Sequence, residues 1–228
     1  INQLLDLSKL EGSNLTLEPI CADLVPFVRG LLGAFESLAQ QRGIATSFTA
    51  DPAEFVADFD PDKLEKIVYN LLSNAFKFTF DGEICVTLRQ AGTTAEFVVR
   101  DSGTGIPAFE MSRLFERFHR IDNARGRTHE GSGIGLALVQ ELVKLHGGTI
   151  SAESNDGGEA AGNVVDAAER GTTFRISIPL GTVHLAPEQV RGRRISAPPS
   201  AGASPFVQEA LRWLPDAEHP DRGAEIPS

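Results

Sequence analysis

The hydrophobic residues of segment 64–79 recur at three- and four-residue steps, which predicts a helix with one buried face. A polar stripe of Asn70, Asn74 and Lys77 follows the same spacing along another side of this helix. An amide oxygen can ligate a hard cation such as Mg²⁺, and an ammonium group can neutralise phosphate oxygens. The stripe therefore fits a metal-chelated nucleotide, although two solvent-exposed Asn side chains would give the same pattern.

Helical periodicity also marks residues 1–11, 19–41 and 134–146. The first of these segments is too short to be stable alone, so we expect it to pack against a partner helix outside this chain. A short amphipathic helix is predicted at 205–214. It follows a stretch at 181–204 that is rich in Pro, Ser, Ala, Gly and Arg and has the composition of a linker.

Capping residues indicate where these helices begin and end. Asp60 can cap the central helix, with Pro61 at its first helical position. Gly43 and Gly147 follow the two longest of the other patterns and predict their ends. Pro26 would remove one hydrogen bond inside the longest pattern, so its regular helix is predicted to begin near that residue.

Period-two alternation between these helices predicts strands. The predicted strands are residues 44–50, 54–59, 83–90, 94–101, 149–153 and 172–179, of which the first two turn at Asp51 and Pro52. The third and fourth are predicted to form a hairpin, because only a short Gly-containing turn separates them. Residues 154–170, rich in Gly, Ala and Asn, are predicted to be a surface excursion.

The composition is that of an ordinary globular protein, with 228 residues, 41% hydrophobic and 23% charged. No apolar run reaches the roughly 20 residues of a membrane span. Cys21 and Cys85 lie far apart, which favours a reduced, cytoplasmic setting. The net charge of -10 argues against a nucleic-acid partner and requires any polyphosphate site to be a local basic region. Because the first residue is Ile, we expect a piece of a longer protein.

Two glycine-rich turns are candidate ligand-binding sites. Residues 101–107 place Asp101 at a strand end, followed by glycines that allow a ligand close to the backbone. The carboxylate could accept from an exocyclic amine such as that of adenine, or simply cap a turn. Residues 131–136 place alternating glycines before a helix N-terminus, where backbone N–H groups and the helix dipole suit phosphate. This second turn lacks the Lys of a P-loop.

The segment 109–130 between these turns is the local basic region, because it carries several Arg and His residues against few acids. Its later half, 122–128, is polar and without pattern, which predicts a mobile lid over the site. A basic loop on an acidic protein is often merely solvated. Its position between two glycine turns favours the functional interpretation.

Four motifs taken together resemble a known family. They are Asn70 with Asn74, the turn 101–105, the run 115–118 (Phe-Glu-Arg-Phe) and the turn 131–135, and they look like the N, G1, F and G2 boxes of sensor histidine kinases. Residues 171–174 resemble the family's motif on the closing strand. The resemblance covers roughly 19–180. It implies the Bergerat ATP-binding fold, an α+β two-layer sandwich whose mixed sheet carries helices on one face.

The resemblance also implies the ligands, ATP and Mg²⁺. Asn74 would ligate the metal, Asn70 and Lys77 would contact the phosphates, and Asp101 would accept from the adenine amine. The residues implied to bind ATP are Asn70, Asn74, Lys77, Phe78, Asp101, Gly103, Gly105, Ile106, Arg117, Gly131, Gly133, Gly135, Leu136, Thr172 and Thr173. Phe78 and Ile106 would flank the base. Phe115 and Phe118 would anchor the lid and contact a neighbouring helical domain.

The domain organisation implied by the resemblance has three parts. Residues 1–14 resemble the end of the dimerisation helix, 15–181 the ATP-binding catalytic domain, and 182–228 a linker with one short helix. The family's phosphoacceptor histidine lies on a helix upstream and has no counterpart among the five His residues here. The expected partners are that dimerisation domain, in a homodimeric parent, and the receiver domain of a response regulator. The domain itself is expected in the cytoplasm. This expectation also allows a parent protein that is anchored in a membrane.

The function implied is the ATP-binding part of a two-component histidine kinase, in a sensor or hybrid protein. One alternative is an ATP-hydrolysing clamp of the same fold, as in gyrase. Those relatives carry a Glu one turn before the metal-binding Asn, and the corresponding residue here is Asn70, which cannot act as a base. Another alternative is a scaffold that binds nucleotide without catalysis.

Overall fold

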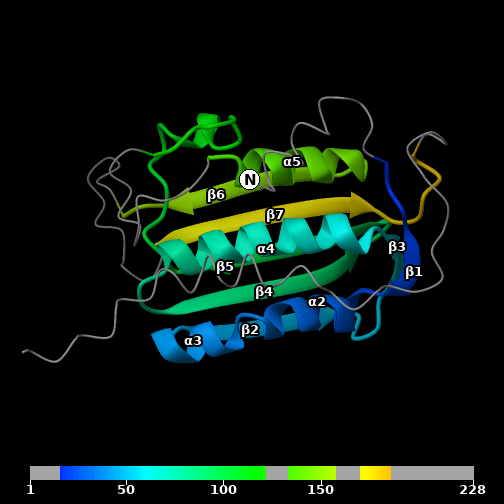
Figure 1. The fold of residues 1–228 in the computed structure, drawn as a ribbon, viewed down its shortest axis with the longest axis horizontal. Helices are drawn as coiled ribbons and strands as arrows, with labels where there is room; N and C mark the ends of the chain where they lie inside the picture. The colour runs from blue at the N-terminus through cyan, green and yellow to red at the C-terminus, as the bar shows by residue number, and fades with distance from the viewer. Residues whose placement is uncertain (1–15, 122–132, 158–169, 186–228) are drawn as a thin grey trace, which may run out of the picture.

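The main feature of the fold is a five-stranded sheet with helices on one face (Figure 1). The computed structural model describes residues 16–121, 133–157 and 170–185. The strands of the sheet are β2 (Ala45–Asp51), β4 (Glu83–Ala91), β5 (Thr94–Asp101), β6 (Thr149–Asn155) and β7 (Gly171–Pro179). Their order across the sheet is β2-β4-β5-β7-β6. β2 runs parallel to β4, and every other neighbouring pair is antiparallel. The predicted α+β class with a mixed sheet is therefore confirmed.

The helices and the core lie on the same side of this sheet (Figure 1). The helical elements are α2 (Leu24–Gly33), α3 (Glu36–Arg42), α4 (Pro61–Phe78), the single 3₁₀ turn η1 (Met111–Arg113) and α5 (Gly135–Leu145). Alternate residues of β4, Ile84, Val86 and Leu88, are buried beneath them. In α4, Ile67 and Val68 are completely buried, with no exposed surface.

The opposite face of the sheet is polar. Glu96 on β5 forms ion pairs with Arg89 on β4, at 2.7 Å, and with Arg175 on β7, at 3.6 Å. Thr49 and Thr87 share a hydrogen bond across β2 and β4. We call this surface the open face, because Figure 1 shows no helix behind the strands.

The central helix begins as predicted. The Asp60 carboxylate accepts a hydrogen bond from the backbone N–H of Lys63 at 3.1 Å, and Pro61 is the first helical residue. The same carboxylate accepts from the backbone N–H of Glu18 at 2.7 Å. Asp60 is 1% exposed. This buried cap therefore also joins the helix to the segment that enters the domain.

The helical pattern over 19–41 does not form one helix, whereas the prediction that regular helix begins near Pro26 is confirmed, because α2 begins at Leu24. Residues Ile20–Asp23 form strand β1, which pairs antiparallel with β3 (Val56–Phe59) in a separate two-stranded sheet. Asp23 then caps α2 by accepting from Val25 N, and it also accepts from Phe55 N. Strand pairing and this cap outweigh the helical periodicity of the segment. A second break, at Ala34 and Phe35, separates α2 from α3.

The remaining strand and helix predictions agree with the structure more closely. The hairpin is confirmed as β4 and β5, and the helix predicted at 134–146 is confirmed as α5. The predicted strands 44–50 and 54–59 exist as β2 and β3, but they belong to different sheets. Strand β6 extends to Asn155, so the surface excursion begins later than residue 154.

Some predictions fall outside the described residues. These are the helices at 1–11 and 205–214 and the lid at 122–128, while the three-part domain division stays a prediction. Among the helices in the part of the chain that the structure describes, none has the length and hydropathy needed to cross a membrane.

Candidate functional site

The polar stripe of α4 begins beside the start of α5. Asn70 is 5% exposed, and its Nδ2 donates to the backbone carbonyl of Lys66 at 2.7 Å. Its Oδ1 would lie only 2.7 Å from a Cβ atom at Gly135, the first residue of α5. Only a residue without a side chain allows this approach. Asn70 and the second glycine turn, far apart in sequence, are therefore adjacent.

The rest of the stripe is more accessible. Asn74 lies one turn after Asn70 and is half-buried. Lys77 is in the last turn of α4, and its Nζ lies 5.4 Å from the centre of the Phe78 ring. The C-terminal half of α4 thus carries an amide and a cation, and its last residue, Phe78, bonds to the turn that follows β5.

Asp101 is a buried hydrogen-bond acceptor at the end of β5. Its Oδ1 accepts from the backbone N–H groups of Gly103, at 2.9 Å, and Thr172, at 3.3 Å. Burial raises the pKa of this carboxyl group to about 6, and the two N–H bonds oppose that rise. At neutral pH the carboxylate is charged, so it can accept a hydrogen bond from a ligand's amine.

The first glycine turn is pressed between α4 and β6. Thr104 N donates to the carbonyl of Phe78, the last residue of α4, at 3.1 Å. A Cβ atom at Gly103 would lie 2.5 Å from the same carbonyl oxygen. Gly105, with φ of +71°, packs directly on the backbone of Asn155. The Asp101 end of the sheet and the end of α4 are consequently tied together.

The second glycine turn is tied to the segment that carries the Phe-Glu-Arg-Phe motif. Phe118 N donates to the carbonyl of Gly133 at 2.9 Å, and both residues have positive φ. Ile134 precedes α5 and provides no side-chain cap. The first backbone N–H groups of a helix lack partners within it, so the N-terminus of α5 is suited to an anion.

The other residues predicted to bind ATP differ in burial and in the face of the sheet on which they lie. Leu136 packs partly buried against the core, Arg117 is exposed, and Gly131 lies outside the described residues. Thr172 is buried on the same side as Asp101, its partner across β5 and β7. The next residue, Thr173, lies opposite Arg100 and faces the open face of the sheet.

The basic segment is partly neutralised by its own acids. His119 lies 2.7 Å from the carboxylate of Glu110, and Arg113 forms an ion pair with Glu116 at 3.0 Å. Exposed apolar surface remains at Phe109 and Phe118, which are 78% and 63% exposed. Within the part of this segment that the structure describes, fewer positive charges are available for phosphate than the composition suggested.

Sequence reasoning missed Ser154. Its hydroxyl accepts from Ile106 N at 2.8 Å, donates to the carbonyl of Gly171 at 2.9 Å and lies 2.9 Å from the hydroxyl of Thr172. The sequence pattern assigns Ser154 to the surface excursion at 154–170, whereas the structure places it in β6. The alternation of Ile150 and Ala152 with exposed residues continues to it, and that signal could have placed it on the buried side of the strand.

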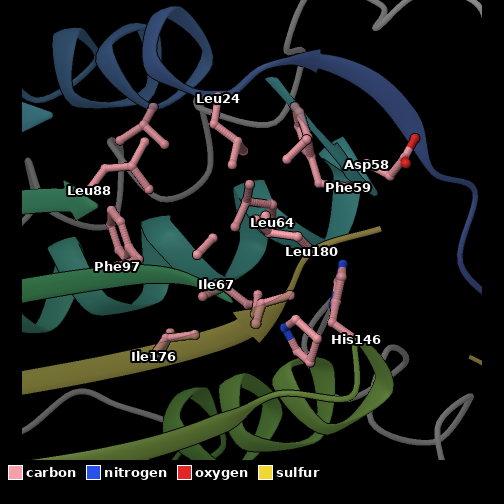
Figure 2. A pocket seen from close by; sticks show the side chains of 15 residues that line it. Leu24, Asp58, Phe59, Leu64, Ile67, Leu88, Phe97, His146, Ile176 and Leu180 are labelled. Atoms are coloured by element: carbon pink, nitrogen blue, oxygen red, sulfur yellow. The ribbon is translucent and has the colours of Figure 1, made fainter. Parts of the chain in front are cut away.

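A cavity lies at the other end of α4, away from these residues (Figure 2). Its volume is about 30 Å³, and apolar side chains such as Leu64, Phe97 and Ile176 line it. His146 reaches one end of the cavity beside Leu180. Burial lowers the pKa of His146, whose Nδ1 contacts the carbonyl of Leu142 at 2.7 Å. The apolar lining and small volume do not suit a nucleotide.

Comparison with curated proteins finds sensor kinases. The sensor histidine kinase TmoS of Ectopseudomonas mendocina is 37% identical over 182 residues, which are 79% of this chain and 17% of TmoS. The chain thus spans about a sixth of that relative's length. Sensor histidine kinase CusS of Escherichia coli K12 is 34% identical over 180 residues, covering 78% of this chain and 34% of CusS.

Comparison with solved structures finds the same fold. The mycobacterial sensor histidine kinase MprB has a TM-score of 0.54 at 30% identity, over 72% of this chain and 98% of that one. Histidine kinase ThkA in complex with response regulator protein TrrA has a TM-score of 0.60 at 21% identity, over 79% of this chain and 48% of that one. At that identity the second match supports the fold alone.

A family model described as histidine kinase-, DNA gyrase B- and HSP90-like ATPase matches residues 59–182. The matched region contains α4, both glycine turns, Asp101 and Thr172, the elements that the structure brings together. Because the match covers more than half of the chain, the chain belongs to the family of histidine kinase-, DNA gyrase B- and HSP90-like ATPases.

Proposed function

We propose that this chain is the ATP-binding catalytic part of a sensor histidine kinase, which presents the γ-phosphate of ATP to a histidine on another domain. The observation that carries the proposal is that α4 connects two features: Asn70 meets Gly135 at the start of α5, and the last residue of α4, Phe78, bonds to the glycine turn that follows the buried carboxylate of Asp101. One end of this site suits phosphate and the other suits a base with an amine. Phosphoryl transfer needs mainly positioning and charge neutralisation, which such a site can supply.

The adenine end of the proposed site is built around Asp101. Both hydrogen bonds that the described residues donate to this carboxylate go to Oδ1. Oδ2 is therefore the oxygen we assign to the exocyclic amine. Phe78 and Ile106 would contact the ring, since the first joins the glycine turn through its carbonyl and the second follows Gly105.

The phosphate end is assigned to α5 and α4. The N-terminal N–H groups of α5 would bind phosphate oxygens, with Asn70 beside them and Lys77 two turns farther along α4. Asn74 fits Mg²⁺, because that ion usually keeps several waters and takes one or two protein oxygens together with phosphate oxygens. When bound, Mg²⁺ would neutralise phosphate charge. No cluster of three acidic, His or Cys ligands exists among the described residues, which agrees with such a phosphate-borne metal.

The metal assignment has a direct test. Asn74→Ala should weaken ATP binding roughly tenfold in Mg²⁺ and leave binding in EDTA nearly unchanged, as measured by isothermal titration calorimetry. An equal loss under both conditions would show that Asn74 does not serve the metal. Ser151→Ala, at an exposed position of β6, is the matched control and should bind normally in both buffers.

The kinase activity is distinguished from hydrolysis by residue chemistry. Asn70 is an amide whose nitrogen is committed to the Lys66 carbonyl, so it cannot activate water as a general base. We therefore expect slow ATP hydrolysis by the chain alone. Transfer to a histidine needs no such base on this helix.

The deciding experiment mixes the 228-residue chain with a separate helical domain that carries a phosphoacceptor histidine, in γ-labelled ATP and Mg²⁺. Label that is stable to base and labile to acid should appear on the helical domain. Tight ATP binding without any transfer would support the scaffold alternative instead. Rapid phosphate release without a helical domain would support an ATPase clamp.

The proposed partners follow from the same assignment. Residues 1–14 are proposed as the end of a dimerisation helix in a homodimeric parent, 15–181 as the ATP-binding domain and 182–228 as a linker. The histidine kinase ThkA has been solved in complex with a response regulator protein. We propose a response-regulator receiver domain as the final acceptor of the phosphate here as well.

A further inference from the structure

Ser154 occupies a junction between three backbone segments. It is the second-last residue of β6 and lies directly across from Thr172 on β7. Its Oγ accepts from Ile106 N at 2.8 Å, and it can donate to the carbonyl of Gly171 at 2.9 Å. The hydroxyl of Thr172 stands 2.9 Å away. A serine hydroxyl has one donor and two acceptor sites, so these three contacts use its full capacity.

Hydrogen bonds with Ser154 and Thr172 hold the first glycine turn, which begins at Asp101. Thr172 donates its N–H to Asp101 Oδ1, and its side chain contacts Ser154. Ile106, at the far end of the turn, bonds to Ser154. Both ends of the segment 101–106 are therefore fixed to one pair of neighbouring residues, Thr172 and Ser154. The distance between the Asp101 carboxylate and Ile106 therefore depends on these hydrogen bonds.

The turn has little other freedom. Gly105 packs directly on the backbone of Asn155, the residue after Ser154, and Gly103 lies against the Phe78 carbonyl. Loss of the Ser154 hydroxyl would leave the N–H of Ile106 without its partner in a half-buried position. The turn would then shift or open toward water to satisfy that N–H group.

We propose that Ser154 is a positioning residue for base recognition, which holds Ile106 and Asp101 at the separation that an aminopurine requires. This inference rests on the proposed ATP site and concerns how that site selects its base. Ser154 does not itself contact the nucleotide. Its contribution should therefore appear in the preference for a 6-amino group rather than in the binding of the triphosphate.

The test compares ATP with purine riboside triphosphate, which lacks the 6-amino group, by calorimetry on the full 228-residue chain. Ser154→Ala should weaken ATP about three- to tenfold, the range expected for one hydrogen bond. The purine riboside compound should lose much less affinity, so the ratio of the two affinities should fall. Ser154→Thr keeps the hydroxyl on a β-branched side chain suited to a strand and should restore the ratio.

Control variants separate positioning from folding. Ser151→Ala, on the same strand but exposed, should leave both affinities unchanged. If Ser154→Ala does not fold, Ser154→Cys takes its place, because a thiol fills the space with only weak hydrogen bonds. Equal losses for both nucleotides, or an unchanged ratio in a folded variant, would overturn the inference. A wild-type chain that binds neither nucleotide, or binds both equally, would instead contradict the proposed adenine site.

Discussion

At the scale of single residues, Asp101 shows how burial and hydrogen bonding oppose each other. The carboxyl group is 5% exposed, which raises its pKa, yet it receives two backbone N–H groups that favour its charged form. The described residues supply no positive partner to this buried carboxylate, so its burial in the charged form costs free energy. A ligand amine would offset part of that cost, which makes this residue a sensitive probe of nucleotide binding.

Replacing Asp101 by Asn should reduce ATP affinity roughly ten- to a hundredfold. Loss of a hydrogen bond to a charged group costs about 1.5–3 kcal/mol, and the amide can also turn a donor toward the adenine amine. Calorimetric titration in Mg²⁺ would measure the change. Glu153→Gln is the matched control, because that carboxylate is exposed on β6. An unaltered affinity in Asp101→Asn would place the base elsewhere.

The ionisation of Asp101 should also appear in stability. Because the folded pKa, about 6, lies above the ordinary aspartate value of 3.8, the folded state holds this proton more tightly. The resulting stabilisation is present below pH 3.8 and is lost as pH rises through about 6, a change of about 3 kcal/mol.

Urea unfolding of the wild type and Asp101→Asn from pH 4 to pH 7 measures this term as the difference between the two proteins. The difference in free energy of unfolding should move against the wild type as pH rises. A difference that does not vary with pH would show that the carboxyl titrates normally. Using the difference removes the contribution of the other carboxyl groups, which both proteins share.

The site residues that sequence could identify were those whose chemistry is unusual for their position. Asn70 and Asp101 stood out because a polar stripe and a carboxylate before glycines are distinctive patterns. Ser154 was missed because a single Ser near Gly and Asn has the composition of a loop. Its importance comes from partners 17 to 48 residues away, and no local pattern reports such contacts.

At the scale of elements, the two glycine turns illustrate different demands on the backbone. The first lies against the α4 C-terminus and β6, so it needs small residues because neighbouring atoms leave no room. The second joins α5 to the segment before it through positive φ. A glycine in the exposed interior of α2, Gly30, has neither constraint.

Gly103→Ala and Gly30→Ala should therefore change stability in opposite directions. The first places a Cβ 2.5 Å from the Phe78 carbonyl oxygen, and overpacking of this kind costs about 1–3 kcal/mol. The second meets nothing within 4 Å and should stabilise α2 by about 0.5–1 kcal/mol. Thermal and urea unfolding would report both changes. Destabilisation by both would show that α2 does not have the described conformation.

Element types were predictable where one physical signal dominated. The 18-residue helix α4 combines a cap, a proline at the first position and a buried stripe, and all three appear in the sequence. Residues 20–23 gave the wrong element because their pairing with β3 is a contact between segments more than 30 residues apart. The hydrophobic pattern of so short a strand does not differ from that of a helix turn.

At the scale of the whole molecule, Leu17 and Glu18, near the start of the described residues, are bound to the core. Leu17 is 2% exposed, and Glu18 N bonds to the carboxylate of Asp60 at the start of α4. The last described residues are held in turn by His184, whose Nε2 lies 2.9 Å from the carbonyl of His146. These contacts mark the smallest span that should retain the fold.

A chain shortened to residues 15–185 should keep ATP affinity within about twofold of the full chain. A version that starts at residue 19 should lose about 2–4 kcal/mol of stability, because it lacks a buried Leu and a hydrogen bond to a buried carboxylate. Urea unfolding of the three proteins provides the comparison. A large loss of affinity on removing residues 186–228 would assign that tail to the binding site.

The open face of the sheet offers a practical advantage for following this protein in solution. Its side chains, among them Arg89, Glu96 and Arg175, point away from the layer of helices, so the thickness of the sheet separates them from the proposed nucleotide site. In a Ser151→Cys variant that also carries Cys21→Ser and Cys85→Ser to remove the native thiols, a fluorescent reporter at this exposed position of β6 would lie behind the strands. Ligand titrations could then be monitored with the dye on the face of the sheet opposite the proposed nucleotide site.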